Sequence, residues 1–229
     1  MNSEELLEKW RASWVRGEGE ECVRFLQFLY EPARYVHGSR MRKVFCDLEC
    51  VRTLAATRRG WVRINGLLLH HFSLAGPSEG EPNLLPRQRI IYESCNRLQR
   101  VANLAGAIIC SSEIQLVVQR GEHCKILEAI GDEAYGFAIR RTVFFADAIA
   151  RLSHMELHGH TPSKRAAEAG RWCVSACLDG LAADVKKRFA LKFPAGRGWQ
   201  SAAKAPAGPV EDAWSLVSAL LARVDGGAS

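Results

Sequence analysis

The 229-residue sequence has no long uncharged hydrophobic run. Its longest apolar stretch, residues 101–112, lies between Arg100 and Glu113 and is far shorter than the roughly 20 residues that a membrane-spanning helix needs. The first residues, MNSEELLEKW, are acidic and lack the apolar core of a secretory signal peptide. We therefore expect a protein that is made and kept in the cytosol.

The motifs of common catalytic sites are also missing. The 8 cysteines include no CxxC pair, which removes the usual zinc and thioredoxin-like signatures. The glycines lack the spacing of a phosphate-binding loop, and no GxSxG nucleophile motif occurs. We expect no catalytic residue, no bound metal and no cofactor.

Three histidines form the pattern HxxxHxH, at His154, His158 and His160. In a helix the first two imidazoles would share a face, as they do in some zinc sites. The pattern lacks the glutamate that HExxH sites carry, and Gly159 is expected to end a helix before His160. A solvated helix end is the favoured interpretation, and a zinc-dependent hydrolase remains a hypothesis that rests on this cluster alone.

Cysteines four residues apart, Cys46 with Cys50 and Cys173 with Cys177, would occupy successive positions on one helix face. In a reducing cytosol these thiols stay free, and we expect them to act as buried small hydrophobic side chains.

The composition is that of a globular protein, with 48% hydrophobic and 24% charged residues and a net charge of +6. The basic residues occur in small groups among acidic ones, which favours solvated helix faces over one functional patch. These groups are Arg40, Arg42 and Lys43; Arg58 and Arg59; Arg140 and Arg141; and Lys186, Lys187 and Arg188.

Apolar residues recur at intervals of three and four through most of the chain, which predicts an all-α fold, a compact multi-helix orthogonal bundle. Residues 61–74 fit a helix better than a strand pair around Asn65 and Gly66. Thr161 and Pro162 are a strong helix start. Gly121 and Gly131 are expected to end helices. The longest predicted helix covers residues 91–109.

The distribution of Gly, Pro, Ser and Ala predicts the domain organisation. A helical domain is expected over 1–194, with a loop break near 76–86, then a linker over 195–209. The linker carries Trp199, which either docks on its own domain or contacts a partner. An amphipathic tail helix is expected over 210–229.

Four segments together carry a family resemblance. Residues 28–41 (FLYEPARYVHGSRM), 97–122 (RLQRVANLAGAIICSSEIQLVVQRGE), 126–141 (ILEAIGDEAYGFAIRR) and 169–194 (AGRWCVSACLDGLAADVKKRFALKFP) resemble, in order and spacing, the SctK/YscK family of bacterial type III secretion components. The chain departs from the family pattern at Gly38 and in the residues after 194.

The resemblance implies a helical adaptor of the cytosolic sorting platform, at the cytosolic face of the bacterial inner membrane. Its expected partners are the inner-membrane ring protein (SctD-like) and the pod protein (SctQ-like), and through the pod the stator (SctL-like) and the ATPase (SctN-like). It would meet the membrane through these partners only. Candidate partner-binding residues are Tyr35, His37, Arg140, Arg141, Lys186, Lys187 and Arg188.

A basic helical nucleic-acid-binding regulator is the alternative. Such a protein needs a recognition helix rich in Arg, Asn and Gln. Residues 88–100 come nearest, but their periodic face is apolar and is typical of a core helix.

Overall fold

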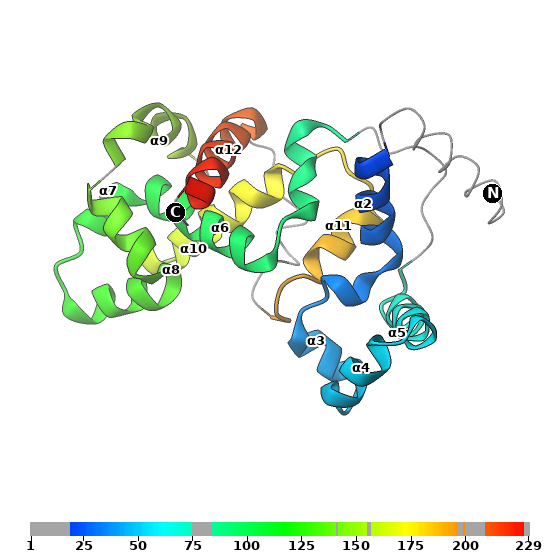
Figure 1. Cartoon of the computed structure of the whole chain (residues 1–229). Coiled ribbons are helices and arrows are strands. Elements are labelled where there is room, and N and C mark those ends of the chain that lie inside the picture. Colours follow the sequence, from blue (N-terminus) through cyan, green and yellow to red (C-terminus); the bar gives the residue numbers. More distant parts are fainter. Residues whose placement is uncertain are drawn as a thin grey trace. The chain divides into compact units, whose positions relative to one another are not determined.

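The computed structural model describes residues 19–74, 84–140, 142–154, 157–196, 199 and 209–226. These residues form helices and short 3-10 turns and contain no strand, which confirms the expected all-α fold (Figure 1). The chain divides into two compact units: Met1–Tyr92 with Leu181–Arg197 (unit 1), and Glu93–Gly180 with Gly198–Ser229 (unit 2). The domain boundaries that the sequence suggests at 194 and 209 remain a prediction.

Unit 1 contains a run of short helices and one helix from much later in the chain. These are α2 (Gly19–Tyr30), η1 (Pro32–Arg34), α3 (Gly38–Val44), α4 (Leu48–Ala55), α5 (Arg58–His71), η2 (Pro86–Tyr92) and α11 (Ala183–Ala190). The side chains of His37, Asp47 and Thr57 accept hydrogen bonds from backbone N–H groups at the starts of α3, α4 and α5. These caps explain why three helices follow one another so closely.

Helix α5 confirms the helical alternative for residues 61–74. Asn65 is not at a hairpin turn but is buried, and it makes two hydrogen bonds of 2.9 Å. Its Oδ1 accepts from the Ala33 N–H and its Nδ2 donates to the Trp61 carbonyl. Ile64 and Leu68 pack with Val51 of α4 in the core of this helix pair.

Unit 2 is built around helix α6. It contains α6 (Cys95–Ile109), α7 (Ser111–Gln115), α8 (Arg120–Arg140), η3 (Thr142–Phe145), α9 (Ala146–Leu152), α10 (Pro162–Ala176) and α12 (Val210–Gly226). Helix α6 packs against α8, α10 and α12, and most of its side chains from Leu98 to Ile109 are buried. The helix predicted over 91–109 is therefore shorter, because residues 86–92 form the separate turn η2.

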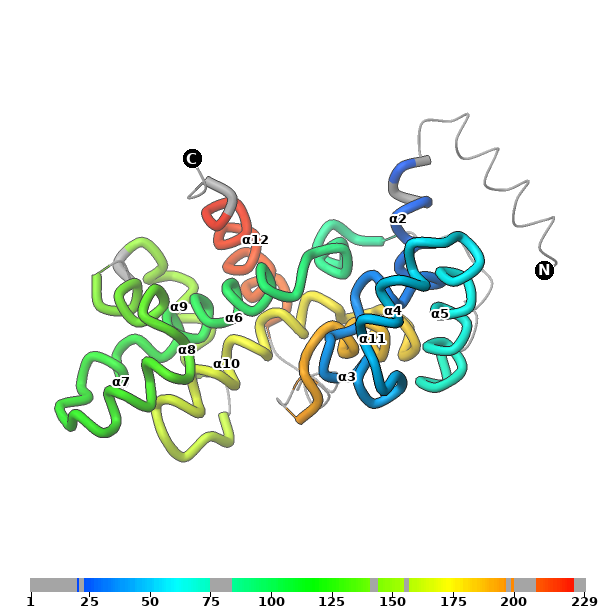
Figure 2. The backbone as a smooth tube through the Cα atoms, turned by 60° about the horizontal axis from the view of Figure 1, so that its bottom comes forward, coloured from blue at the N-terminus to red at the C-terminus, as the bar shows by residue number. Residues whose placement is uncertain are grey.

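Two glycines let α6 and α10 approach very closely, and Figure 2 shows the two helices side by side. A Cβ atom on Gly106 would lie 1.9 Å from the Ala166 carbonyl oxygen. A Cβ atom on Gly170 would lie 1.9 Å from the Ala102 carbonyl oxygen. Only glycine fits at either position, because the obstacle is the backbone of the facing helix.

Other local predictions have mixed outcomes. Thr161 caps α10 through its Oγ1, which accepts from the Lys164 N–H, as expected. Gly131 has a φ of 83° and kinks α8, but Gly121 lies inside the first turn of α8, so the prediction that it ends a helix is wrong. Cys173 and Cys177 are buried as predicted. Cys46 and Cys50 are exposed, against expectation, because Cys46 lies in the turn before α4 and α4 buries Val51 instead of Cys50.

The tail helix α12 packs on α6, α9 and α10. Its fully buried residues are Ala213, Leu216, Val217 and Leu220, while Trp214 and Leu221 are half-buried at the edges of that stripe. Trp199 is also buried, which agrees with docking on the protein itself.

Candidate interaction surfaces

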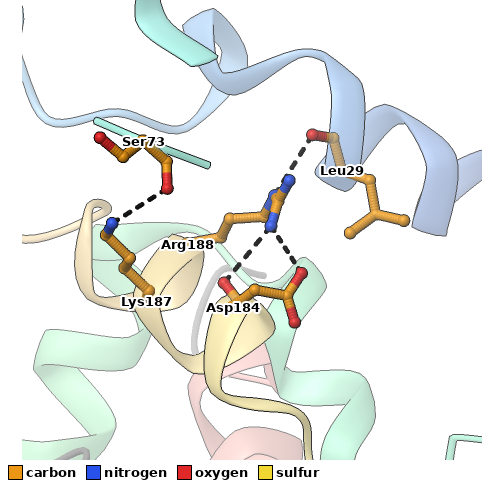
Figure 3. A network of polar contacts seen from close by, with 5 residues as sticks. All are labelled: Leu29, Ser73, Asp184, Lys187 and Arg188. Atoms are coloured by element: carbon orange, nitrogen blue, oxygen red, sulfur yellow. Dashed lines mark hydrogen bonds and ion pairs between the residues drawn. The ribbon is translucent and has the colours of Figure 1, made fainter. Parts of the chain in front are cut away.

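Arg188 does not lie on an outward basic patch with Lys186 and Lys187, so that part of the prediction is wrong. Its side chain is 1% exposed. It follows the buried Val185 by three residues, so helical spacing places it on the buried face of α11. Its Nε donates to the Leu29 carbonyl (3.3 Å) and its Nη1 to the Asp184 carboxylate (2.7 Å), as Figure 3 shows.

Lys187 takes part in the same polar network. Its Nζ donates to the Ser73 carbonyl at 3.1 Å, just beyond the end of α5 (Figure 3). Arg188 reaches the last turn of α2 at Leu29, so α11 joins two segments that are more than a hundred residues away in the sequence. Lys186 is half-buried. Arg188 thus contributes to the folding of unit 1, and the exposed Lys187 adds one hydrogen bond to it.

Two further cations are buried in unit 1. The Arg40 Nε donates to the Phe193 carbonyl (2.7 Å) and its Nη2 to the Ala190 carbonyl (3.3 Å), which caps the end of α11. The Lys192 ammonium lies within 6.0 Å of the ring centroids of Phe28, Tyr35 and Phe189. Cation–π attraction stabilises a buried ammonium in such surroundings.

Tyr35 and His37 belong to this framework as well. The Tyr35 ring stacks on Phe28 at 4.9 Å, and burial raises the pKa of its phenol. The His37 N–H donates to the Leu191 carbonyl (2.9 Å), and its Nδ1 accepts from the Ser39 N–H (3.1 Å). The Tyr35 ring and the backbone of His37 therefore contact the segment that follows α11, while the half-buried His37 side chain caps α3.

Arg140 is exposed at the end of α8, while Arg141 lies outside the described residues. The neighbouring Ile139 is 42% exposed and Leu116, at the end of α7, is 79% exposed. The Gln115 Nε2 donates to the Ala138 carbonyl at 2.9 Å, which brings these two helix ends together. Leu116, Ile139 and Arg140 are thus exposed near the junction of these two helix ends, which is named here the α7–α8 surface.

A hollow of about 500 Å³ lies between η3–α9 and α12, also in unit 2. Phe144, Phe145 and Leu216 line it, and so do Arg151 and Asp212, which form an ion pair (3.0 Å). Phe144 is 81% exposed.

A third surface, on α5 in unit 1, was missed by sequence reasoning. Its exposed side chains include Val62 and Leu67 together with Arg59 and Arg63. The signal was present in the sequence, because residues 58–71 contain three arginines and no acidic residue.

The histidine cluster is not arranged as a metal site. Helix α9 ends at Leu152, so His154 and His158 do not share a helix face, and all three histidines are exposed. Within the described ranges no group of three His, Cys, Asp or Glu residues could hold a metal ion. Nor is any described helix both long enough and apolar enough to cross a membrane.

The segment that came nearest to a recognition helix belongs to the core. Residues 88–100 run through η2 into α6, and Gln88, Ile90, Ile91 and Leu98 are buried. The apolar face of this segment therefore packs in the core, as its periodicity predicts.

A comparison with protein families gives a match that covers most of the chain. The family described as YOP proteins translocation protein K (YscK) matches residues 23–225, which span both units from α2 to α12. No curated protein and no solved structure matches the chain.

Proposed function

Because the chain belongs to the YscK family and is therefore a type III secretion protein, we propose that it acts as a non-enzymatic adaptor of the sorting platform. In this role it links the cytoplasmic domain of the inner-membrane ring protein (SctD-like) to the pod protein (SctQ-like). The pod in turn connects to the stator (SctL-like) and the ATPase (SctN-like). The adaptor works in the cytoplasm, at the inner membrane, and touches the membrane only through its partners.

The family match over residues 23–225 carries this proposal. The distribution of exposed apolar residues supports it, because an adaptor needs two separate binding surfaces. Unit 2 exposes Leu116, Ile139 and Phe144, and unit 1 exposes Val62 and Leu67. Apolar side chains exposed in groups are typical of protein–protein contacts.

The candidate partner-binding residues divide by burial. Arg140 and Lys187 are exposed, and Arg140 adjoins the α7–α8 surface, so these two remain candidates together with Arg141 and Lys186. Tyr35, His37 and Arg188 act through the fold of unit 1, because their polar atoms or rings already contact other parts of that unit.

Crosslinking in cells that produce the secretion system tests the proposal. Tagged chain is captured, and crosslinked peptides are identified by mass spectrometry. We expect peptides of both the ring protein and the pod protein. The double variant Leu116→Asp and Ile139→Asp should lose one of them while its far-ultraviolet circular dichroism stays unchanged. Recovery of neither protein, or of nucleic acid in their place, would refute the adaptor role.

A further inference from the structure

Helix α5 exposes one continuous face along its whole length. Arg59, Val62, Arg63, Gly66, Leu67 and His70 are all exposed. At 3.6 residues per turn these positions cover an arc of about 140°. Val62 is 64% and Leu67 54% exposed, so the face offers aliphatic groups as well as positive charge. The opposite side packs on α4 and η1 through Ile64, Asn65 and Leu68.

Several features of this helix are unfavourable for the isolated protein. Arg58 and Arg59 lie in the first turn, where the helix dipole is positive and an acidic residue would be stabilising. Arg59 and Arg63 are like charges four residues apart. Within the described part of the chain, neither forms an ion pair. Gly66 lies in the helix interior, where alanine would be more stable.

The residues that make α5 less stable lie on its exposed face or at the edge of that face. Sequences violate local stability rules mainly where function requires it. A negatively charged partner would compensate the dipole and the like-charge repulsion together. The pattern therefore indicates a surface that is completed in a complex.

We propose that this face, named the α5 surface, binds an acidic amphipathic helix of a partner protein. The guanidinium groups of Arg59 and Arg63 fit partner carboxylates, which they can bind in a bidentate manner. Val62 and Leu67 fit the apolar stripe of the same partner helix. Gly66 lets the partner backbone approach closely.

The open position at Gly66 favours a partner helix over a lipid surface. A Cβ atom on Gly66 would meet nothing within 4 Å, so the glycine is not required by the fold of this chain. In unit 2 the glycines Gly106 and Gly170 serve a close helix crossing, and a glycine serves the same purpose between two proteins. Binding to a lipid surface is not strengthened by the absence of a side chain, because it depends on buried apolar area and on charge. The face also lacks lysine and the large aromatic anchors that interfacial helices carry.

The proposal rests on the adaptor function for the identity of the proteins to be tested. Purified full chain is titrated against the purified ring-protein cytoplasmic domain and the purified pod protein. The variants are Gly66→Leu, which fills the open position, and Arg59→Glu with Arg63→Glu. Gly136→Leu is the matched control, because Gly136 lies inside α8 and a Cβ atom there also meets nothing within 4 Å. Arg120→Glu with Lys164→Glu matches the charge change on unit 2.

We expect one of the two complexes to lose affinity by at least about tenfold with Gly66→Leu and with the charge reversal. The salt dependence of that complex should weaken in the charge-reversed variant, and both controls should bind that same partner like the wild type. A photocrosslinker at position 62 should map to a partner segment richer in Asp and Glu than in Lys and Arg.

Wild-type binding that none of the α5 variants changes would overturn this inference and leave the adaptor function intact. Failure of the wild type to bind either protein would overturn both. Two further results would replace the partner helix with another occupant. One is binding to anionic vesicles that Arg59→Glu with Arg63→Glu abolishes and Gly66→Leu leaves intact, and the other is a chain dimer that Gly66→Leu dissociates in sedimentation experiments.

Discussion

Replacing Gly106 by alanine tests the close crossing of α6 and α10. The added Cβ atom would lie 1.9 Å from the Ala166 carbonyl oxygen, whereas ordinary contact begins near 3.4 Å. The helices must therefore separate by about 1.5 Å, which removes a large part of the dispersion contacts along the crossing. Overpacking lowers the free energy of unfolding by about 1 to 3 kcal/mol. The value here should be near about 3 kcal/mol, because the obstacle is backbone, which cannot move aside by changing a rotamer.

Alanine also has a higher helix propensity than glycine, by about 1 kcal/mol. The expected net loss for Gly106→Ala is therefore about 2 kcal/mol in the free energy of unfolding of unit 2. In a domain of this size that corresponds to a fall in Tm of roughly 8 °C. Urea unfolding followed by circular dichroism, together with the fluorescence of the buried Trp172, measures the change.

Gly136→Ala is the control for this experiment. It adds the same methyl group in α8, where a Cβ atom meets nothing within 4 Å. It should raise the stability of unit 2 by up to about 1 kcal/mol. If Gly106→Ala were as stable as the wild type, or gained as much as Gly136→Ala, the close crossing would be refuted.

Three other predictions concern buried cations, thiols and a surface ion pair. Arg188→Met should lower the free energy of unfolding of unit 1 by about 3 kcal/mol, because the Leu29 carbonyl and Asp184 lose a buried donor. Lys187→Met should change the same free energy by under about 0.5 kcal/mol. Equal effects of the two variants in chemical unfolding would contradict the buried role of Arg188. Burial raises the pKa of Cys110 to about 12 and that of Cys173 well above its usual value. Iodoacetamide at pH 8 should therefore leave both thiols unmodified in the native protein while it labels the exposed Cys46, Cys50 and Cys124. Peptide mass spectrometry measures the labelling, and early modification of Cys110 would count against its burial. The hydrogen bond from Arg100 lowers the pKa of Glu133, so this pair adds stability above about pH 4.3 that disappears as the pH falls through the lower folded-state pKa. Arg100→Gln should therefore lower the free energy of unfolding by under about 1 kcal/mol at pH 7 and leave it unchanged at pH 2. A stability difference that grows as the pH falls would contradict the lowered pKa.

Local patterns in the sequence determined the helical class, the start of α10 at Thr161 and the helical interpretation of residues 61–74, most of which lie in α5. Periodicity and capping depend on residues within a few positions of one another, so they can be predicted without the fold. The family resemblance over four segments was confirmed for the same reason, because order and spacing along the chain are sequence properties. The spacing of three residues from Val185 could also have placed Arg188 inside, but its charge argued for solvent.

Only the tertiary structure showed why that charge is tolerated. The carbonyl of Leu29 and the carboxylate of Asp184 satisfy Arg188, and the first of these comes from a helix about 160 residues away. The same holds for Gly106 and Gly170, which look like ordinary small residues until α6 and α10 are brought together. Burial, partner atoms and the surfaces left exposed depend on contacts between distant segments, and those contacts are absent from any local pattern.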